Sequence, residues 1–183
     1  MRMDGERIAV RAVQLKDASS LLELEAANRD FFQSFTGLRD DSFYTVQGQE
    51  ERIRELHKLA EDDRGYFYLV CLKQTDAVIG EVILSEVVRD NLQGCWIGYF
   101  LDREHNGKGY MTEAVKLVVR HAFEQLGLHR IEAGVMPHNG ASTQVLLKAG
   151  FAKEGISRKN VKINGNWEDH QLLAIIEDDL REK

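Results

Sequence analysis

The stretch Trp96-Ile97-Gly98-Tyr99-Phe100-Leu101 decides the fold, together with the residues that follow it as far as Leu126. It is apolar and aromatic, which predicts a buried β-strand over residues 96–101. A polar loop and Gly107-Lys108-Gly109 come next. From Ala114 onward, apolar residues recur at the spacing of an amphipathic helix that ends near Gly127. The order is therefore strand, glycine-containing turn and helix.

The turn between this strand and this helix is suited to binding phosphate. Gly107 and Gly109 let the backbone turn without a Cβ clash, so that several amide N–H groups can point in one direction. The N-terminus of the helix adds unpaired donors and a partial positive charge. An ordinary connection between a strand and a helix would explain the two glycines equally well.

Spacing excludes two common nucleotide-binding loops. A Walker loop needs a glycine separated by four residues from the Gly-Lys pair, and Ser or Thr after the lysine. Asp102 and Gly109 occupy those two places. A dinucleotide-binding fingerprint needs a third glycine three residues after Gly109, where this chain has Thr112.

The composition indicates one domain over residues 1–183. Of the 183 residues, 43% are hydrophobic and 30% are charged, which disfavours a disordered chain. No apolar run approaches the length of a membrane-spanning helix, and the first residues do not resemble a signal peptide. Cys71 and Cys95 lie in apolar runs, which predicts small core residues of a reduced, cytoplasmic protein rather than a disulfide or a metal site. The net charge of -6 disfavours a general nucleic-acid binder and would suit an amine-bearing substrate.

Hydrophobic periodicity predicts an α+β domain with a mixed sheet, in the order β-α-α-β-β-β-α-β-α-β-β. Further strands are expected at residues 7–13, 66–73, 77–84 and 129–135, and further helices at residues 46–62 and 141–149. Another helix should follow Asp17 as its N-cap. Residues 151–177 are expected to form a hairpin with the type I′ turn Asn164-Gly165. The helix between strands 96–101 and 129–135 implies that these two strands are parallel.

Several aromatic residues fall in a segment without helical or strand periodicity after the first helix. They are Phe31, Phe32, Phe35, Phe43 and Tyr44. They can form the wall of a substrate pocket, or they can fill the core. Both interpretations stay open at the level of the sequence.

Two motifs connect the chain to a known family. The first runs from Tyr99 to Leu101 and continues over residues 107–114, and the second comprises residues 137–142 and 148–151. Both resemble the motifs of the GNAT superfamily of acetyl-CoA-dependent N-acetyltransferases. Residues 153–156 and 163–170 are similar to the ribosomal-protein-alanine N-acetyltransferases, especially the RimJ type, within the RimJ/RimL branch. The resemblance covers nearly the whole chain and implies the acyl-CoA N-acyltransferase fold, with a mixed, mostly antiparallel sheet flanked by helices.

The resemblance implies where acetyl-CoA binds. The pantetheine arm would pair with the main chain of Tyr99, Phe100 and Leu101. The pyrophosphate would lie on the turn, and the residues implied there are Asn106, Gly107, Lys108, Gly109, Tyr110 and Met111. Glu104 departs from the Gln or Arg of the general motif, so a phosphate contact from that side chain is not carried over. A backbone N–H near Phe100 would stabilise the oxyanion of the reaction.

Proton transfer needs an acid for the departing thiolate and a base for the amine. Ser142 is the candidate acid, with helix capping as its alternative role. Asn139 would hydrogen-bond the pantetheine amides, or cap the same helix. Glu81 and Glu132 are candidate bases because carboxylates are unusual in strand-like runs.

Other bases remain open at this stage. His138 lies beside the second motif, and Glu113 lies in the first turn of the central helix. A water relay is also compatible with the sequence. The RimI type has a carboxylate five residues before the motif Asn, where this chain has Gly134, so that mechanism is not carried over.

The resemblance therefore implies a cytoplasmic enzyme that transfers acetyl groups to the N-terminal α-amine of a protein. The leading acceptor is a ribosomal protein that begins with Ala or Ser. Two alternatives remain, a small-amine or antibiotic N-acetyltransferase and a non-catalytic acyl-CoA-binding protein. Retention of Ser142 beside an intact phosphate turn favours catalysis. No membrane or nucleic-acid partner is expected, and both a monomer and a homodimer stay open.

Overall fold

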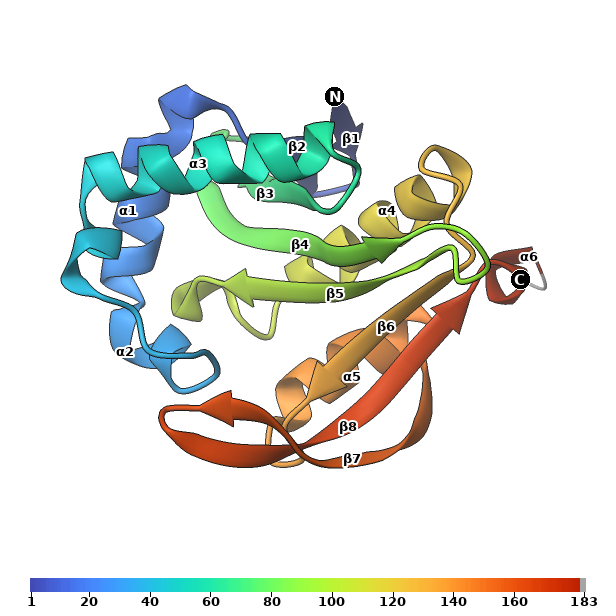
Figure 1. Ribbon diagram of the computed structural model, residues 1–183. Coiled ribbons are helices and arrows are strands. Elements are labelled where there is room, and N and C mark those ends of the chain that lie inside the picture. Colours follow the sequence, from blue (N-terminus) through green and yellow to red (C-terminus); the bar gives the residue numbers. More distant parts are fainter. Residues whose placement is uncertain (182–183) are drawn as a thin grey trace.

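The chain folds into a mixed β-sheet with helices on both of its faces (Figure 1). The computed structural model describes residues 1–181. The strands are β1 (Arg2–Asp4), β2 (Ile8–Ala12), β3 (Tyr66–Leu72), β4 (Val78–Val88), β5 (Gly94–Leu101), β6 (Arg130–Val135), β7 (Ala152–Ile163) and β8 (Asn166–Ile176). The α-helices are α1 (Ala18–Ala27), α2 (Arg29–Gln33), α3 (Val46–Glu61), α4 (Tyr110–Glu124), α5 (Gly140–Ala149) and α6 (Asp178–Arg181). Short 3₁₀ helices are η1 (Leu15–Asp17), η2 (Asp41–Tyr44) and η3 (Arg103–His105).

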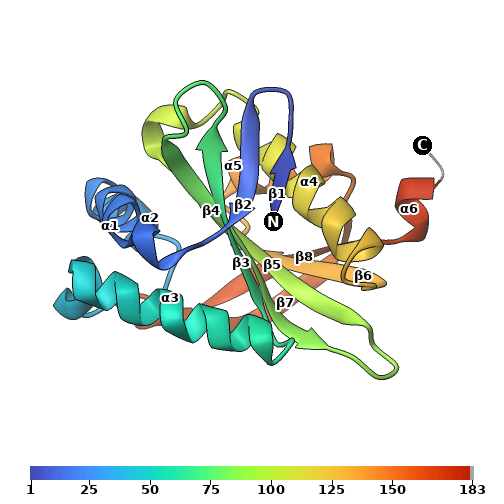
Figure 2. The same cartoon turned by 90° about the horizontal axis from the view of Figure 1, so that it is seen from above.

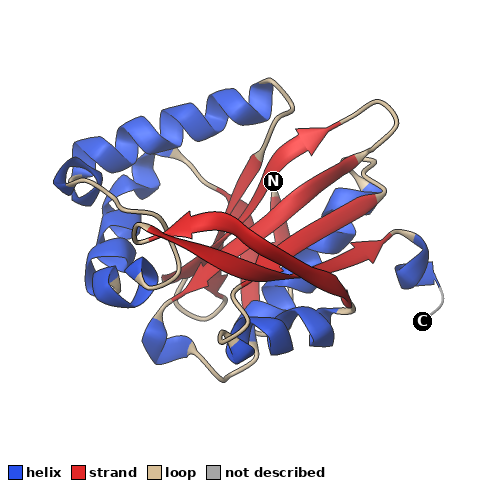
Figure 3. Cartoon of the chain, turned by 60° about the horizontal axis from the view of Figure 1, so that its bottom comes forward, coloured by secondary structure: helices blue, strands red, loops and turns tan. Residues whose placement is uncertain are grey.

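One sheet contains all eight described strands, in the order β1-β2-β3-β4-β5-β6-β8-β7. Neighbouring strands are antiparallel except for β5 and β6, which are parallel and joined through α4. Helices α1, α2 and α3 lie on one side of the sheet, and α4 and α5 lie on the other (Figures 2 and 3). The predicted α+β fold and the parallel pair are confirmed. Among residues 1–181, no helix has both the length and the apolar character needed to cross a bilayer.

An apolar cluster lies on each face of the sheet. Strand β3 shows why, because its side chains alternate between the faces: Phe67 and Leu69 pack with α1 and α3, whereas Tyr68 and Val70 pack with α4. The buried stripe of α4 is the one predicted from the sequence, and it comprises Val115, Val118, Val119, Ala122 and Phe123. Cys71 and Cys95 are free and buried in these two clusters, as expected for small core residues.

Several local predictions differ from the structure. Strand β1 and helix α2 were not predicted, and α4 begins at Tyr110, before its apolar repeat. Asp17 is the N-cap residue of α1, as predicted, but its side chain forms no capping hydrogen bond. Its carboxylate instead accepts a hydrogen bond from the Gln14 N–H at 2.8 Å and binds the Arg11 guanidinium at 2.7 and 2.8 Å. The Arg11 guanidinium and the Gln14 N–H thus hold this carboxylate away from the helix.

Strands β5 and β6 separate soon after they meet. Strand β5 pairs with β6 at Gly94–Arg130, Cys95–Ile131 and Trp96–Glu132. Beyond Trp96, β5 continues along β4 as far as Leu101, while β6 continues along β8 (Figure 1). No described strand pairs with the β6-facing edge of β5 over residues 97–101. This separation positions the site.

The hairpin β7–β8 turns where the sequence predicted. Asn164 has φ 48° and Gly165 has φ 82°, so both central residues occupy the left-handed region that a type I′ turn requires. The tip reaches α2, because the Gln33 amide donates to Asn164 Oδ1 at 2.9 Å and Asn164 donates back to the Gln33 carbonyl at 2.9 Å. Two segments far apart in the chain are therefore fastened together beside the opening between β5 and β6.

Candidate active site

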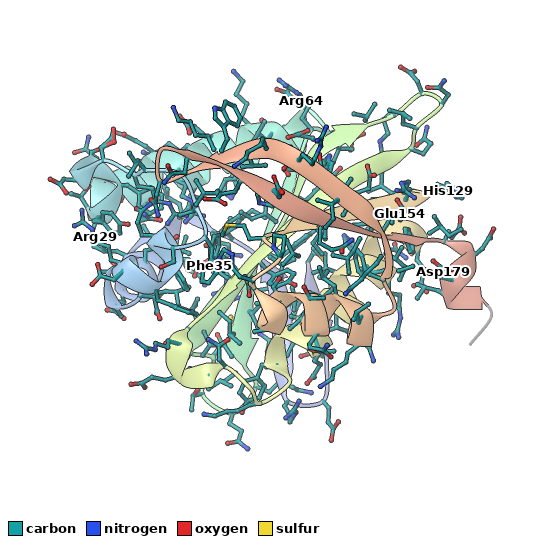
Figure 4. All side chains as sticks on the ribbon, turned by 90° about the horizontal axis from the view of Figure 1, so that it is seen from below. Arg29, Phe35, Arg64, His129, Glu154 and Asp179 are labelled. Atoms are coloured by element: carbon teal, nitrogen blue, oxygen red, sulfur yellow. The ribbon has the colours of Figure 1, made fainter. Side chains whose placement is uncertain are left out.

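Two adjoining cavities lie where β5 and β6 separate. The larger has a volume of about 440 Å³ and the smaller about 150 Å³. The residues that line both are Phe35, Tyr99, Phe100, Asn139 and Ser142, so the cavities meet at these side chains. Figure 4 shows Phe35 between the α1–α2 segment and the strands of the sheet.

The glycine-containing turn forms one wall of the larger cavity. Gly107 has φ 76° and Gly109 has φ 80°, a region that favours glycine, and α4 begins directly afterwards. In the described chain, the backbone N–H groups of residues 107–110 donate no hydrogen bond to another protein group. Several amide donors and a helix N-terminus are thus available together, which fits a phosphate group.

Arg7 holds this turn in place and was not anticipated. Its Nη1 donates to the Lys108 carbonyl at 2.7 Å, and its guanidinium lies 5.0 Å from the centre of the Tyr110 ring. The carboxylate of Glu113 accepts from the Arg7 backbone N–H at 3.0 Å and pairs with the Arg7 side chain at 3.4 Å. Glu113, one of the open candidates for the base, is therefore engaged in fixing β2 to α4.

Most residues implied for the cofactor line the larger cavity. They are Tyr99, Phe100, Leu101, Asn106, Gly107, Gly109, Met111, Asn139 and Ser142. Lys108 and Tyr110 are not among the lining residues; Arg7 contacts the Lys108 carbonyl and the Tyr110 ring. One wall was missed at the sequence level: Ala141, Gln144, Val145 and Lys148 follow one another at helical spacing on one face of α5. Helical spacing around Ser142 could have predicted this wall from the sequence.

The aromatic segment contributes both to the cavity and to the core. Phe31, Phe32 and Phe35 line the larger cavity, and the Phe32 ring lies 4.9 Å from the Phe100 ring. Phe32 is also buried, so its two proposed roles coincide. Phe43 and Tyr44 do not line either cavity in the described structure, and arginine side chains cover their rings.

Ser142 and Tyr99 form a hydroxyl pair at the junction of the two cavities. Ser142 Oγ lies 2.8 Å from Tyr99 Oη, which also donates to the Ser142 carbonyl at 3.1 Å. Burial raises the pKa of the Tyr99 phenol, and the hydrogen bond with Ser142 offsets part of this rise. The phenol therefore stays protonated at neutral pH. The Ser142 N–H donates to Asn139 Oδ1 at 3.2 Å, so Asn139 caps α5 and leaves the Ser142 hydroxyl free for another role.

The two carboxylates proposed as bases lie outside both cavities. Glu81 is fully buried on the face covered by α1 and α3, where its Oε1 accepts from Arg52 at 2.8 Å. Its Oε2 is buried without a hydrogen-bond partner in the described chain. Glu132 accepts from Arg130 at 2.9 Å, and Arg130 also pairs with Glu154. Figure 4 places Glu154 toward the other end of the sheet from Phe35. Neither Glu81 nor Glu132 is among the described residues that line the cavities.

Comparison with known proteins places this chain in a family. The family model described as an acetyltransferase (GNAT) domain matches residues 7–152. The probable N-acetyltransferase YjcK of Bacillus subtilis is 54% identical over 177 residues, which cover 97% of this chain and 98% of the relative. The crystal structure of ribosomal-protein-S5-alanine acetyltransferase from Vibrio fischeri superposes with a TM-score of 0.92 at 34% identity, covering 98% of each chain. RimJ of Mycobacterium smegmatis, in complex with CoA-disulfide, gives a TM-score of 0.89 at 28% identity, covering 94% of this chain and 83% of that chain.

These similarities extend over the elements that build the site, from the separated strands to the turn before α4 and the start of α5. The same elements leave main-chain groups and hydroxyls open to an extended, phosphate-bearing molecule. The chain therefore belongs to the GNAT acetyltransferases, enzymes that take the acetyl group they transfer from acetyl-CoA.

Proposed function

We propose that this enzyme acetylates the N-terminal α-amine of a protein, and that its leading acceptor is a ribosomal protein beginning with Ala or Ser. The observation that carries the proposal is the character of the smaller cavity. Its volume, about 150 Å³, is on the scale of a cavity that admits a benzene-sized group. A free amine with a small first side chain fits such a space.

The charge of the cavity wall supports the same acceptor. Among the described residues that line the smaller cavity there is no Asp, Glu, Lys or Arg. A polyamine or an aminoglycoside carries several positive charges, and a site for it would need several carboxylates near one another. A peptide N-terminus brings one charge and several backbone hydrogen-bonding groups. The similarity to the Vibrio fischeri S5-alanine acetyltransferase, at 34% identity, also supports an alanine N-terminus.

The residues of the site suit the proposed reaction. The free edge of β5 offers main-chain groups to an extended thioester arm, and the turn at Gly107 and Gly109 offers amides to its phosphates. A backbone N–H near Phe100 is the proposed donor to the oxyanion. The Ser142 hydroxyl, paired with Tyr99, is the proposed acid for the departing thiolate. The proposal places the reaction in the cytoplasm, where free buried cysteines such as Cys71 and Cys95 stay reduced.

A competition assay tests the choice of acceptor. Peptides that begin with Ala or Ser are offered with acetyl-CoA against spermidine and an aminoglycoside, and each peptide has a control with a blocked N-terminus. We expect kcat/KM for the best free peptide to exceed that for either small amine by at least about tenfold. Faster acetylation of spermidine or the aminoglycoside than of every peptide would overturn the peptide proposal and leave the family assignment intact.

Mass spectrometry of total protein N-termini, with and without the gene for this enzyme, identifies the acceptor itself. A ribosomal protein should lose its N-terminal acetyl group in the strain that lacks the enzyme. An unchanged set of acetylated N-termini would contradict the proposal.

A further inference from the structure

The wall of the smaller cavity contains a histidine that neither the motifs nor the proposed proton donor involve. In the described structure, Tyr99 and His170 are the titratable side chains among the residues lining this cavity. Tyr99 keeps its proton at neutral pH because burial raises the pKa of the phenol. An imidazole is therefore the group on this wall that is able to take up a proton in that range.

The orientation of His170 leaves one ring nitrogen available. The residue is 7% exposed, and its Nδ1 lies 3.3 Å from the Glu168 carbonyl oxygen. A carbonyl can only accept, so this contact assigns the hydrogen of the neutral ring to Nδ1 and the lone pair to Nε2. Nε2 has no hydrogen-bond partner in the described chain. It is also absent from the fully buried side-chain atoms that lack a partner, so it is accessible to solvent.

Gly134 shows which edge of the ring meets the cavity. A Cβ atom at Gly134 would lie 3.5 Å from His170 Cδ2, the carbon bonded to Nε2, and 3.7 Å from Trp96 Cζ3. Gly134 itself lines the smaller cavity, so the ring edge with Cδ2 and Nε2 lies at that wall. Residue 134 has no side chain, so it places none over this edge.

We propose that Nε2 of His170 accepts the proton that the acceptor amine must lose before it reacts. The inference rests on acetyl transfer to an amine, as proposed above, but not on which amine is used. It assigns the base to β8, in the smaller cavity whose wall also includes the hydroxyl pair of Ser142 and Tyr99.

The proton and electron balance is complete without a further reagent. The acceptor ammonium gives one proton to Nε2, and its nitrogen lone pair attacks the acetyl carbon. The N–C bond forms, the C–S bond breaks, and the sulfur keeps the bonding electrons. The thiolate takes a proton from the Ser142 hydroxyl, and the proton that leaves the new amide nitrogen restores the Ser142–Tyr99 pair. The imidazolium then releases its proton to solvent, so the net products are the amide, the CoA thiol and one proton.

The surroundings of His170 determine how its pH dependence can be read. Gly134 of β6 lies next to the ring, and Ser157 of β7 is paired with His170 in the sheet. The other residues that line the cavity with it are Phe35, Ile97, Gly98, Tyr99, Phe100, Ala133, Val135, Met136, Asn139, Ser142 and Leu146. Among these residues, Tyr99 is the other titratable group, and it loses its proton only in the alkaline range. Tyr99 therefore adds no acid limb to kcat/KM in the neutral range. The acceptor amine itself titrates there, so the acid limb considered for His170 is the one that remains after the titration of that amine has been subtracted.

The test compares His170→Gln with His129→Gln, because His129 is an exposed histidine just before β6 and does not line the cavities. The acceptor is whichever amine the wild type acetylates best, spermidine included. We expect His170→Gln to lower kcat about 10²-fold, to keep the acetyl-CoA Kd, and to lose the acid limb of kcat/KM. His129→Gln should keep all three. An acceptor whose amine is already neutral at the assay pH should regain much of the lost rate, which a merely structural role would not allow.

Wild-type kcat, or an intact acid limb, in a His170→Gln variant that binds acetyl-CoA normally would overturn the inference. A second measurement needs no variant. The NMR titration midpoint of His170 in the free wild-type enzyme should coincide with the midpoint of the acid limb of kcat/KM, and a difference of more than about one pH unit would also overturn it. A wild type that acetylates no amine at all would instead refute the proposed function.

Discussion

At the scale of single residues, the proposed reaction relies on two hydroxyls and two glycines. Ser142 and Tyr99 come from α5 and β5, and their 2.8 Å contact places a proton donor where the two cavities meet. Asn139 takes over the capping of α5, so Ser142 is not required for it. Gly107 and Gly109 give the turn a conformation that other residues rarely adopt.

Replacing Ser142 with Ala should lower kcat about 10²-fold and leave the acetyl-CoA Kd within about twofold, because the thiolate loses its acid while the cofactor contacts persist. Steady-state kinetics and calorimetry measure the two effects. Thr143→Ala is the matched control, since that neighbouring hydroxyl only bonds the Asn139 carbonyl at 3.3 Å. An unchanged kcat in Ser142→Ala would mean that the acid lies elsewhere.

Replacing Gly109 with Val should weaken acetyl-CoA binding at least about tenfold, or ~1.4 kcal/mol. A Cβ at this position is strained at φ 80° and would lie 3.1 Å from the Arg7 guanidinium, so the turn must move. Gly127→Val provides the control, because Gly127 has φ 64° at the far end of α4 and open space around it. Calorimetry should show weaker binding for the first variant alone. Equal acetyl-CoA affinities in two folded variants would show that this turn does not bind the phosphates of the cofactor.

At the scale of elements, the acceptor side is built by segments that local signals describe poorly. Helix α2 has only five residues, which is too short for a repeating pattern of apolar residues to predict it. It follows Asn28, whose side chain donates to the Leu24 carbonyl at 3.0 Å and accepts the Arg103 N–H at 2.9 Å. The bend between α1 and α2 is thus fixed by the loop after β5, a contact across 75 positions. The Asn164-Gly165 turn, by contrast, is a local signal and was predicted correctly.

Asn164→Gly should raise KM for the peptide acceptor a few-fold and leave the acetyl-CoA Kd unchanged. Glycine keeps the positive φ of the turn but removes both hydrogen bonds to Gln33, so the hairpin tip is released from α2. Initial rates over a range of peptide concentrations measure the change. Gln33→Ala should have a similar effect, and the double variant should add little to either. Fully additive effects would show that the two residues do not act through their contact.

At the scale of the whole molecule, the cofactor half of the site could be predicted and the acceptor half could not. The strand, the turn and α4 are contiguous in the sequence, so their order and spacing already describe the cofactor half. The smaller cavity combines Tyr99 of β5, Gly134 of β6, Ser142 of α5 and His170 of β8. Which side chains from four elements meet depends on register and on the separation of β5 from β6. For the same reason Glu81 and Glu132 were plausible as unusual strand carboxylates, although ion pairs hold them elsewhere.

Stability should fall in acid through Asp17. Burial alone would raise the pKa of this carboxyl, but hydrogen bonds from Arg11 and from the Gln14 N–H lower it below its ordinary value. A lowered folded-state pKa stabilises the protein fully above the unfolded-state pKa, about 4, and the stabilisation disappears as the pH falls through the folded-state pKa. Urea unfolding at pH 7 and at lower pH values should therefore show this loss in the wild type.

Asp17→Asn should unfold more easily at pH 7, by about 3 kcal/mol, because it leaves the largely buried Arg11 without its partner. Its free energy of unfolding should also depend less on pH between about pH 5 and 3 than that of the wild type. Asp41→Asn is the control, since its pair with Arg29 is exposed on the surface and is expected to change stability by less than about 1 kcal/mol. Equal pH dependence in Asp17→Asn and the wild type would contradict the assignment.

The short seam between β5 and β6 has a consequence for how the family can diversify. Within residues 1–181, three residue pairs join the strands from β1 to β5 with those from β6 to β8. Over residues 97–101, the main chain of β5 has no described strand paired with its β6-facing edge. Peptide groups are the same for every amino acid, so recognition along that edge is insensitive to most substitutions. Mutations can therefore accumulate in the side chains that face the acceptor while the capacity to hold the acetyl donor is inherited unchanged. New acceptor preferences can arise in such a scaffold by small steps, none of which has to pass through an inactive protein.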